Sequence, residues 1–338
     1  MIQQNPNVAV VGATGAVGEM MIRILEERNF PVAQLYPLAS ERSAGSTVMF
    51  RGKSCRVERL DQFDFNCAHI GLFSAGGSVS AEHAPRAVAA GCIVVDNTSH
   101  FRNDPSIPLV VPEVNRHALA THQGIIANPN CSTIQMVVAT KPIYDAVGIS
   151  RINVATYQAV SGAGKRAIEE LASQTAQLLN GQAVEPDLMP KQIAFNAIPH
   201  IDSFQDNGYT REEMKMVWET RKILEDQAIE VSPTAVRIPV FYGHSEALHI
   251  ETREKITADQ VRVLLQSAPG VTVLDQRVAG GYPTAVTEAV DSDAVFVGRI
   301  REDISCNKGI CLWVVADNIR KGAALNSIQI AEALLQGV

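Results

Sequence analysis

One cysteine stands where a strand-like run gives way to a helical pattern. Cys131 lies in Asn-Pro-Asn-Cys-Ser-Thr (128–133), after the apolar residues 124–127 and before a long apolar helical run over residues 134–147. At the first turn of a helix, unpaired backbone N–H groups and the helix dipole stabilise a thiolate relative to a thiol. Cys131 is therefore a candidate nucleophile. The alternative is a small buried residue, which is what most cysteines are.

The first 150 residues contain the elements that must position this thiol. Short β-branched runs at residues 8–11, 34–38, 69–73, 92–95 and 125–126 alternate with helical patterns. This alternation predicts an α/β fold, a Rossmann-type doubly wound parallel sheet with helices on both faces. Ligands of such sheets bind at the carboxyl ends of the strands. Cys131 follows such an end, which favours the nucleophile over the inert residue.

The pattern changes after about residue 147. Longer alternating runs at residues 153–160, 235–251, 294–301 and 309–315 predict a second α+β domain with a largely antiparallel sheet. Helical segments are expected over residues 167–180 and 211–226, and a closing helix over residues 323–335.

A glycine-rich loop follows the first strand. Its spacing, Gly12-x-x-Gly15-x-x-Gly18, between a strand and a helix is typical of a turn that binds the pyrophosphate of a dinucleotide at the helix N-terminus. The alternative is a tight strand–helix turn without a ligand. The expected cofactor contacts are Gly12, Thr14, Gly15, Ala16, Val17 and Gly18, with Ser74 and Gly76 at the end of another strand.

The end of the second strand should select the cofactor. An acidic residue there would bind the ribose 2′-hydroxyl of NAD. The chain has Ser40, Arg42 and Ser43, with Glu41 as the one acid, and an arginine with two hydroxyls suits a 2′-phosphate. We therefore expect NADP, although Arg42 as an exposed surface charge is the alternative.

Composition excludes several classes of partner. The 338 residues carry a net charge of −7 without a basic run, which argues against nucleic acid and anionic membranes. No signal-like start or membrane-length apolar run is present, so a cytoplasmic protein is expected.

The six cysteines lack CxxC spacing, and no histidine or acidic cluster accompanies Cys306 and Cys311 in the sequence. We therefore expect no metal site.

A thiolate beside a nicotinamide site suggests thioester chemistry at an aldehyde carbon. The thiohemiacetal oxygen then needs a proton shuttle. His244 is the candidate, because Gly243 interrupts a strand pattern directly before it. His249 alternates within the same strand pattern and is expected on the surface.

Six ordered motifs give the chain a family resemblance. They are GATGAVG (12–18), DNTSHFR (96–102), VVPEVN (110–115), NPNCST (128–133), YQAVSGAG (157–164) and NIRKGA (318–323). Together they closely resemble the aspartate-β-semialdehyde dehydrogenases. The resemblance implies reduction of L-aspartyl 4-phosphate by NADPH to L-aspartate 4-semialdehyde and phosphate, on the route to lysine, methionine and threonine.

The resemblance also implies roles for individual residues. Cys131 would form the acyl thioester, His244 would act as the acid/base, and Gln158 would orient the acyl group. Arg237 would bind the substrate carboxylate in a bidentate manner. The other implied contacts are Glu212 and Lys215 near the ammonium and phosphate groups, Arg102, Asn130 and Ser99 at the phosphate, and Gly162 and Asn318 at the cofactor.

Two of these assignments have ordinary alternatives. Glu212 and Lys215 are three residues apart, as in a solvated helix salt bridge. Arg102 is alternatively a surface charge on a loop.

The resembling fold implies an NADP-binding domain over residues 1–132 and 318–338, and a substrate-binding and dimerisation domain over residues 133–317, in a homodimer. The nearest rival activity is that of N-acetyl-γ-glutamyl-phosphate reductase, which has Asn-Pro-Gly-Cys where this chain has Asn130 before Cys131. A non-catalytic nucleotide-binding paralogue would lack Cys131 or His244. A cysteine hydrolase would leave the glycine loop without a purpose.

Overall fold

The computed structural model describes residues 4–337, which form two compact units. The first unit runs to Asn130 and takes up the chain again from Ala323, and the second comprises Cys131–Gly322. The sequence-based boundaries lie at 132 and 318, so the structure divides the chain a few residues away from them. Cys131 is the first residue of the second unit.

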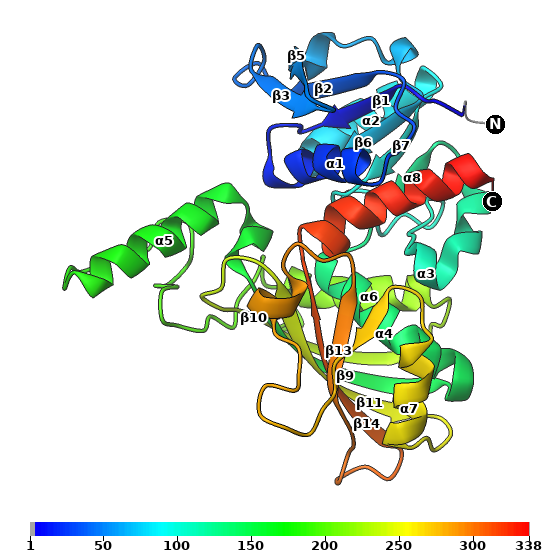
Figure 1. Cartoon of the computed structure of the whole chain (residues 1–338), viewed down its shortest axis with the longest axis vertical. Helices are drawn as coiled ribbons and strands as arrows, with labels where there is room; N and C mark the ends of the chain where they lie inside the picture. Colours follow the sequence, from blue (N-terminus) through cyan, green and yellow to red (C-terminus); the bar gives the residue numbers. More distant parts are fainter. Residues whose placement is uncertain (1–3, 338) are drawn as a thin grey trace. The chain divides into compact units, whose positions relative to one another are not determined.

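The first unit contains a six-stranded sheet in the order β5-β2-β1-β6-β7-β8, and every pairing in it is parallel (Figure 1). Its strands are β1 (Val8–Val11), β2 (Leu35–Ala39), β5 (Glu58–Arg59), β6 (Ile70–Phe73), β7 (Ile93–Asp96) and β8 (Ile125–Ala127). A separate hairpin pairs β3 (Thr47–Phe50) with β4 (Lys53–Arg56). The helices are α1 (Ala16–Glu27), α2 (Gly77–Ala89), α3 (Pro112–Asn115) and α8 (Asn326–Gln336), with short turns η1 (Leu60–Gln62), η2 (Phe65–Cys67) and η3 (Arg116–Thr121).

Two hydrophobic clusters show that helices cover both faces of this sheet. Val8 and Val10 of β1 pack with residues of α1 and α8, whereas Ala9 and Val11 pack with Ala84 and Ala87 of α2. Alternate residues of one strand thus enter opposite cores. The predicted Rossmann-type doubly wound sheet is confirmed. Its strand order reverses between β1 and β6, the place where such sheets bind ligands.

The second unit contains a mixed sheet in the order β10-β9-β11-β14-β13-β12. Its three central pairings are antiparallel and the outer pairs β10-β9 and β12-β13 are parallel. The strands are β9 (Ile149–Gln158), β10 (Glu230–Arg237), β11 (His244–Thr252), β12 (Val271–Val273), β13 (Val295–Glu302) and β14 (Gly309–Ala316). The strand-like run over 235–251 is two strands, because a turn with Gly243 at φ +84° separates them.

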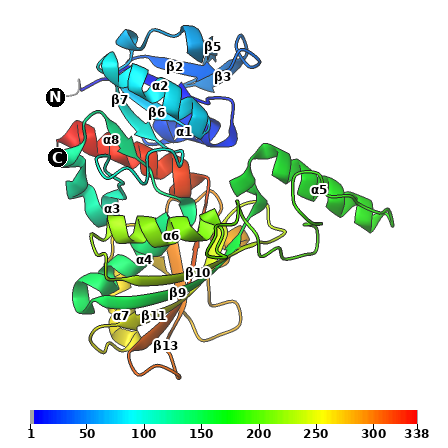
Figure 2. The same cartoon turned by 180° about the vertical axis from the view of Figure 1, so that it is seen from behind.

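Helix α4 (Cys131–Val147) packs against β9, β11, β13 and β14, and α6 (Arg211–Ile223) lies beside it (Figure 2). His244, Glu246, Leu248 and Ile250 of β11 are buried, while His249 is exposed. We call the side of the sheet under α4 the covered face, and the side bearing His249 the open face. The remaining elements are α5 (Lys165–Leu179), α7 (Ala258–Gln266), η4 (Val160–Ala163), η5 (Ala285–Ala289) and, at the unit boundary, η6 (Arg320–Leu325).

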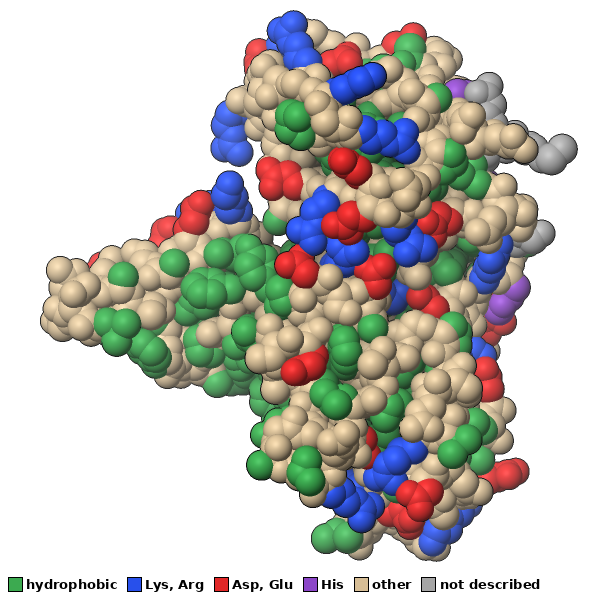
Figure 3. Space-filling model, viewed as in Figure 1, with side chains coloured by type: hydrophobic (Ala, Val, Ile, Leu, Met, Phe, Trp, Pro, Cys, Tyr) green, Lys and Arg blue, Asp and Glu red, His purple; other side chains and the backbone are tan. Residues whose placement is uncertain are grey.

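The segment around α5 exposes apolar side chains. Leu179 is 75% exposed and Phe195 is 65% exposed, and Figure 3 shows hydrophobic side chains spread over this part of the second unit. Large exposed apolar areas mark interaction surfaces. Within residues 4–337, no helix is long and apolar enough to cross a membrane.

Candidate active site

Cys131 is the first residue of α4, as the sequence predicts. Its thiol is partly exposed, and Gly322 packs directly against it. A Cβ at position 322 would lie 2.7 Å from the Cβ of Cys131, which is closer than real carbon contacts come. Gly322 therefore leaves room for the cysteine side chain.

His244 begins β11 on the covered face and is fully buried. Its Nδ1 accepts a hydrogen bond from the Ala159 N–H at 3.0 Å, so the neutral ring carries its hydrogen on Nε2. Burial, reinforced by the positive charge of Arg237, lowers the pKa of His244 to about 3. The ring is thus neutral at physiological pH. Its Nε2 makes no hydrogen bond within the described part of the chain, which leaves Nε2–H as a donor.

Arg237, at the end of β10, is buried beside this histidine. Its Nη1 donates to the carbonyl oxygen of Ala159 at 2.7 Å, so Ala159 holds both Arg237 and His244. A Cβ on Gly162 would lie 3.0 Å from Nη1 of Arg237 and 3.5 Å from Nε2 of His244. Cys131 acts electrostatically on the pKa of Arg237, which places the thiol near the guanidinium. The side chains of Cys131, His244 and Arg237 therefore lie close together in the second unit and form one site.

Gln158 and the ion pair of Glu212 with Lys215 on α6 belong to the same site. Gln158 Nε2 donates to Glu212 Oε1 at 3.3 Å, and Lys215 Nζ donates to Glu212 at 2.9 Å and to Asp202 at 2.8 Å. Burial opposes the charge on Lys215, but Glu212 and Asp202 outweigh it and raise its pKa. The pair is thus a buried group and not the solvated salt bridge of the alternative. Asp202 escaped the sequence analysis because no motif or helical spacing connects it with Lys215.

A second buried acid, Glu246, lies near His244 on β11. Glu246 is two residues from His244 on the same side of β11, and Gln135 is one helical turn from Cys131 on α4. Burial raises the pKa of Glu246 well above its usual range, against an opposing effect of the Gln135 amide. Burial therefore favours the neutral acid form of Glu246.

Asn318 ties the loop after β9 to the turn before His244. Its Oδ1 accepts from the Gly243 N–H at 2.9 Å, and its Nδ2 donates to Ser161 Oγ at 3.0 Å. The side chain thus stabilises the position of His244. The expected cofactor contact of Asn318 remains a prediction, as does that of Gly162.

The first unit contains the glycine loop at the carboxyl end of β1. Gly12 has φ +88°, and a Cβ on Gly18 would lie 2.1 Å from the Gly12 carbonyl oxygen. Gly15 caps α1 without a side-chain hydrogen bond, so the first N–H groups of the helix face no capping side chain. These features fit a bound pyrophosphate. Ser74 and Gly76 follow the last residue of the neighbouring β6, and the Ser74 N–H donates to the carbonyl oxygen of Val11 at 2.8 Å.

The residues after β2 are those expected to contact the ribose 2′-group that distinguishes NADP from NAD. Ser40 and Arg42 are exposed and Ser43 is partly buried. Glu41, the one acid there, forms an ion pair with Arg59 at 2.6 Å. The segment therefore presents an exposed Arg42 and an acid that is already paired with another arginine.

Arg102 and Asn130, two of the residues expected at the phosphate, also belong to the first unit. Arg102 and Asn130 are buried, and Arg102 Nη2 donates to the carbonyl oxygen of Asn97 at 2.9 Å. Arg102 is therefore anchored to the loop after β7 and is not the exposed surface charge of the alternative.

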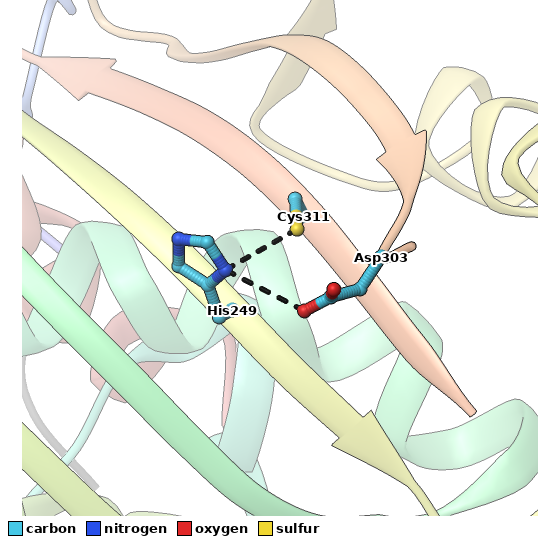
Figure 4. A group of neighbouring side chains, drawn as sticks. All are labelled: His249, Asp303 and Cys311. Carbon is cyan, nitrogen blue, oxygen red and sulfur yellow. Dashed lines mark hydrogen bonds and ion pairs between the residues drawn. The ribbon is translucent and has the colours of Figure 1, made fainter. Parts of the chain in front are cut away.

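One argument from the sequence is wrong. Cys311 does have a histidine and an acid beside it, because the pairing of β11 with β14 and the turn after β13 bring His249 and Asp303 to it (Figure 4). The sequence hides this group, since its members are far apart along the chain and only the sheet register joins them.

Known proteins resemble both units. Residues 7–122 match the family model "Semialdehyde dehydrogenase, NAD binding domain", and residues 140–321 match "Semialdehyde dehydrogenase, dimerisation domain". Aspartate-semialdehyde dehydrogenase of Legionella pneumophila is 66% identical over 97% of this chain and 95% of its own.

Solved structures agree with these matches. Aspartate semialdehyde dehydrogenase II of Vibrio cholerae, in a complex with ASA, has a TM-score of 0.97 at 60% identity over 99% of both chains. The enzyme of Candida albicans, solved with NADP, has a TM-score of 0.76 at 25% identity over 98% of both chains. The protein is an enzyme with a nicotinamide-cofactor domain, and the chain belongs to the aspartate-semialdehyde dehydrogenase family.

Proposed function

We propose that the protein converts L-aspartyl 4-phosphate to L-aspartate 4-semialdehyde and phosphate through a thioester on Cys131, with NADPH as the reductant. The observation that carries this proposal is the meeting of Cys131, His244 and Arg237 in the second unit. A nucleophile, a neutral hydrogen-bond donor and a fixed guanidinium are the groups that acyl transfer from an α-amino acid needs.

In the first step the Cys131 thiolate attacks the acyl carbon. A carbon–sulfur bond forms, the carbon–oxygen bond to phosphate breaks, and phosphate leaves with the electron pair. Gln158 orients the acyl group, since its Nε2 is held by Glu212. Arg102 and Asn130 bind the phosphate.

The second step reduces the thioester. NADPH, when bound, supplies the hydride. His244 donates its Nε2–H to the acyl oxygen and stabilises the negative charge that develops there. The oxygen electron pair then re-forms the carbonyl, the carbon–sulfur bond breaks, and Cys131 returns to the thiolate. The proton consumed overall ends on the released phosphate.

This scheme assigns His244 a more specific role than acid/base catalysis. With Nδ1 occupied by the Ala159 N–H, the ring cannot accept a proton on Nε2 without first losing the one it holds there. A neutral imidazole can nevertheless act as an electrophilic donor, as in triosephosphate isomerase.

Charge complementarity supports the amino-acid substrate. Arg237 suits the α-carboxylate because a guanidinium binds a carboxylate in a planar, bidentate manner. Glu212 suits the ammonium group and Lys215 suits an anionic group. Asp202 keeps Lys215 charged and in place.

For the cofactor we propose NADP, bound by the glycine loop and by Ser40, Arg42 and Ser43. Neutralisation of Glu41 by Arg59 removes the acid that would favour NAD. Replacing Arg42 by Ala should reduce kcat/KM for NADPH and leave that for NADH nearly unchanged. An equal loss with both cofactors would contradict contact with the 2′-phosphate.

We further propose a homodimer assembled through the second unit. The match to a dimerisation domain and the exposed apolar side chains around α5 support it. Light scattering should give twice the 36.5 kDa chain mass. Replacing Leu179 by Glu should favour the monomer, and a monomeric wild-type protein would contradict the proposal.

Phosphate-dependent reduction of NADP tests the activity directly. Purified protein should oxidise aspartate semialdehyde and should leave N-acetylglutamate semialdehyde untouched. Turnover of the acetylated substrate alone would assign the protein to the rival reductase activity. No turnover of either substrate would favour the non-catalytic paralogue.

A further inference from the structure

Three metal-binding side chains of different kinds meet on the open face of the sheet in the second unit. His249 lies on β11, Cys311 lies directly opposite it on β14, and Asp303 follows the last residue of β13. His249 Nδ1 is 3.3 Å from Cys311 Sγ and 3.7 Å from Asp303 Oδ2 (Figure 4). The three donor atoms lie within 4.8 Å of one another.

The geometry argues against a second catalytic triad. A Cys-His-Asp triad uses both ring nitrogens, one toward the thiol and the other toward the carboxylate. Here the thiol and the carboxylate both face Nδ1 of His249, so the ring cannot pass a proton from one to the other. The three atoms instead surround a common point.

Two of the three separations between donor atoms are close to those around a tetrahedral cation. Zinc bonds of the usual lengths to sulfur, nitrogen and oxygen place neighbouring ligand atoms about 3.4–3.6 Å apart. The measured separations from Nδ1, 3.3 and 3.7 Å, lie on either side of that range. A thiolate with an imidazole and a carboxylate is also a donor set that zinc accepts.

The carboxylate is held in position by its own turn. Asp303 Oδ1 accepts hydrogen bonds from the Ser305 N–H at 2.8 Å and from Ser305 Oγ at 2.6 Å. These bonds lower the pKa of Asp303 and leave Oδ2 toward His249. Such supporting bonds are typical of metal ligands, because they orient the side chain before the ion binds.

The same turn supplies a fourth candidate ligand. A Cβ on Gly309 would lie 2.5 Å from Asp303 Cβ and 2.9 Å from Cys306 Cβ, so Asp303 and Cys306 are neighbours around this glycine. Cys306 is a free, partly exposed thiol. Arg301 pairs in register with Cys311 on the neighbouring strand.

From this arrangement we propose that His249, Cys311 and Asp303 bind one zinc-like divalent cation, with Cys306 as the fourth ligand. The ion joins the β13–β14 turn to β11. This site shares no residue with the Cys131 centre and does not depend on the proposed reaction. Zinc binding releases the thiol protons, so the affinity should rise with pH.

Cobalt and zinc titration of the full-length protein tests the site. The titration uses chelator-treated, reduced protein carrying Cys131→Ser, so that the reactive thiol contributes nothing. One Co²⁺ per chain should bind and give the charge-transfer absorption of cobalt–thiolate bonds, which Zn²⁺ should displace. Zn²⁺ should also raise Tm.

Second substitutions in this background identify the ligands. Cys311→Ser should abolish the cobalt–thiolate band, and Cys306→Ser should weaken Zn²⁺ binding at least as much as the roughly 10–100-fold typical of losing a supporting partner. His249→Asn keeps both thiols and should also lose binding, which covers the case in which Cys311→Ser fails to fold. Cys67→Ser, which removes an exposed thiol of the first unit, should change nothing.

Two results would overturn the proposal. One is Zn²⁺ binding by the Cys131→Ser/His249→Asn protein as tight as that of Cys131→Ser alone. The other is no Zn²⁺ bound by reduced Cys131→Ser protein at micromolar metal.

Discussion

The two faces of the sheet in the second unit present the same residue types for different purposes. β11 places His244 on the covered face and His249 on the open face. His249 contacts Cys311 directly, and His244 lies beside Arg237, which is also near Cys131. The difference lies in what contacts Nδ1. A backbone N–H occupies Nδ1 of His244, whereas a thiol and a carboxylate face Nδ1 of His249.

That contact decides what each ring can do. The backbone donor fixes the hydrogen of His244 on Nε2, so the ring is a donor for substrate. Nδ1 of His249 faces two metal-ligand atoms instead, so the ring can bind a cation held between them when its hydrogen is on Nε2. The two cysteines, Cys131 and Cys311, also lie in different environments. Cys131 starts a helix, whose N-terminus favours a thiolate, while burial within a strand raises the pKa of Cys311.

The largest expected effect separates the two cysteines. Cys131→Ser should reduce kcat by about 10⁴-fold or more, because loss of a covalent nucleophile removes the whole pathway. Cys311→Ser makes the same chemical change on the open face and should leave kcat within about twofold in metal-free buffer. The initial rate of phosphate-dependent NADP reduction measures both. A comparable loss in the two variants would break the distinction between the faces.

The next effect separates the two histidines. His244→Ala should cost about 10²–10³-fold in kcat, as loss of one preorganised oxyanion donor does. His249→Ala should cost little. Because burial lowers the pKa of His244 to about 3, kcat should show no histidine step between about pH 5 and 8. A step in that interval that disappears in His244→Ala would show that the ring titrates during turnover.

A smaller effect concerns the two arginines. Arg237→Lys keeps the charge but loses the bidentate geometry, which should cost about 1.5–3 kcal/mol, or roughly 10- to 150-fold in kcat/KM for aspartate semialdehyde. Arg301→Lys on the open face is the matched control and should have no effect. An unchanged kcat/KM in Arg237→Lys would remove this residue from substrate binding.

The sequence predicts more of the covered face than of the open face. Cys131, Gln158 and His244 sit in motifs or at strand ends, where parallel-sheet geometry and glycine punctuation reveal functional positions. Gln135 and Glu246 carry no such signal, because only the packing of α4 on the mixed sheet brings them together. Asp202 carries none either, because it reaches the site through its ion pair with Lys215 of α6. The same holds for His249 and Asp303, which reach Cys311 through strand register. Residues joined by local spacing are predictable, and those joined by long-range pairing are not.

The smallest expected effect concerns stability. Since the folded-state pKa of Glu246 is raised, its stabilising contribution is present below about pH 4.3 and is lost as pH rises toward the folded pKa. His244 acts in the opposite direction, because its contribution is lost as pH falls from about 6.5 to about 3. The unfolding free energy of the Glu246→Gln variant should therefore fall less steeply with rising pH above pH 5 than that of the wild type. Urea unfolding at several pH values measures this, and parallel curves for wild type and variant would mean that Glu246 is already ionised.

The covalent role of Cys131 is the central claim, and intact-mass spectrometry tests it most directly. The protein is mixed with aspartate semialdehyde and NADP without phosphate, so that the acyl-enzyme has no phosphate acceptor, and is then quenched in acid. We expect one aspartyl adduct per active chain, located on Cys131 by peptide mapping and released by added phosphate. NADPH formation without any adduct on Cys131, or an adduct on a different residue that phosphate releases at the rate of turnover, would contradict the account.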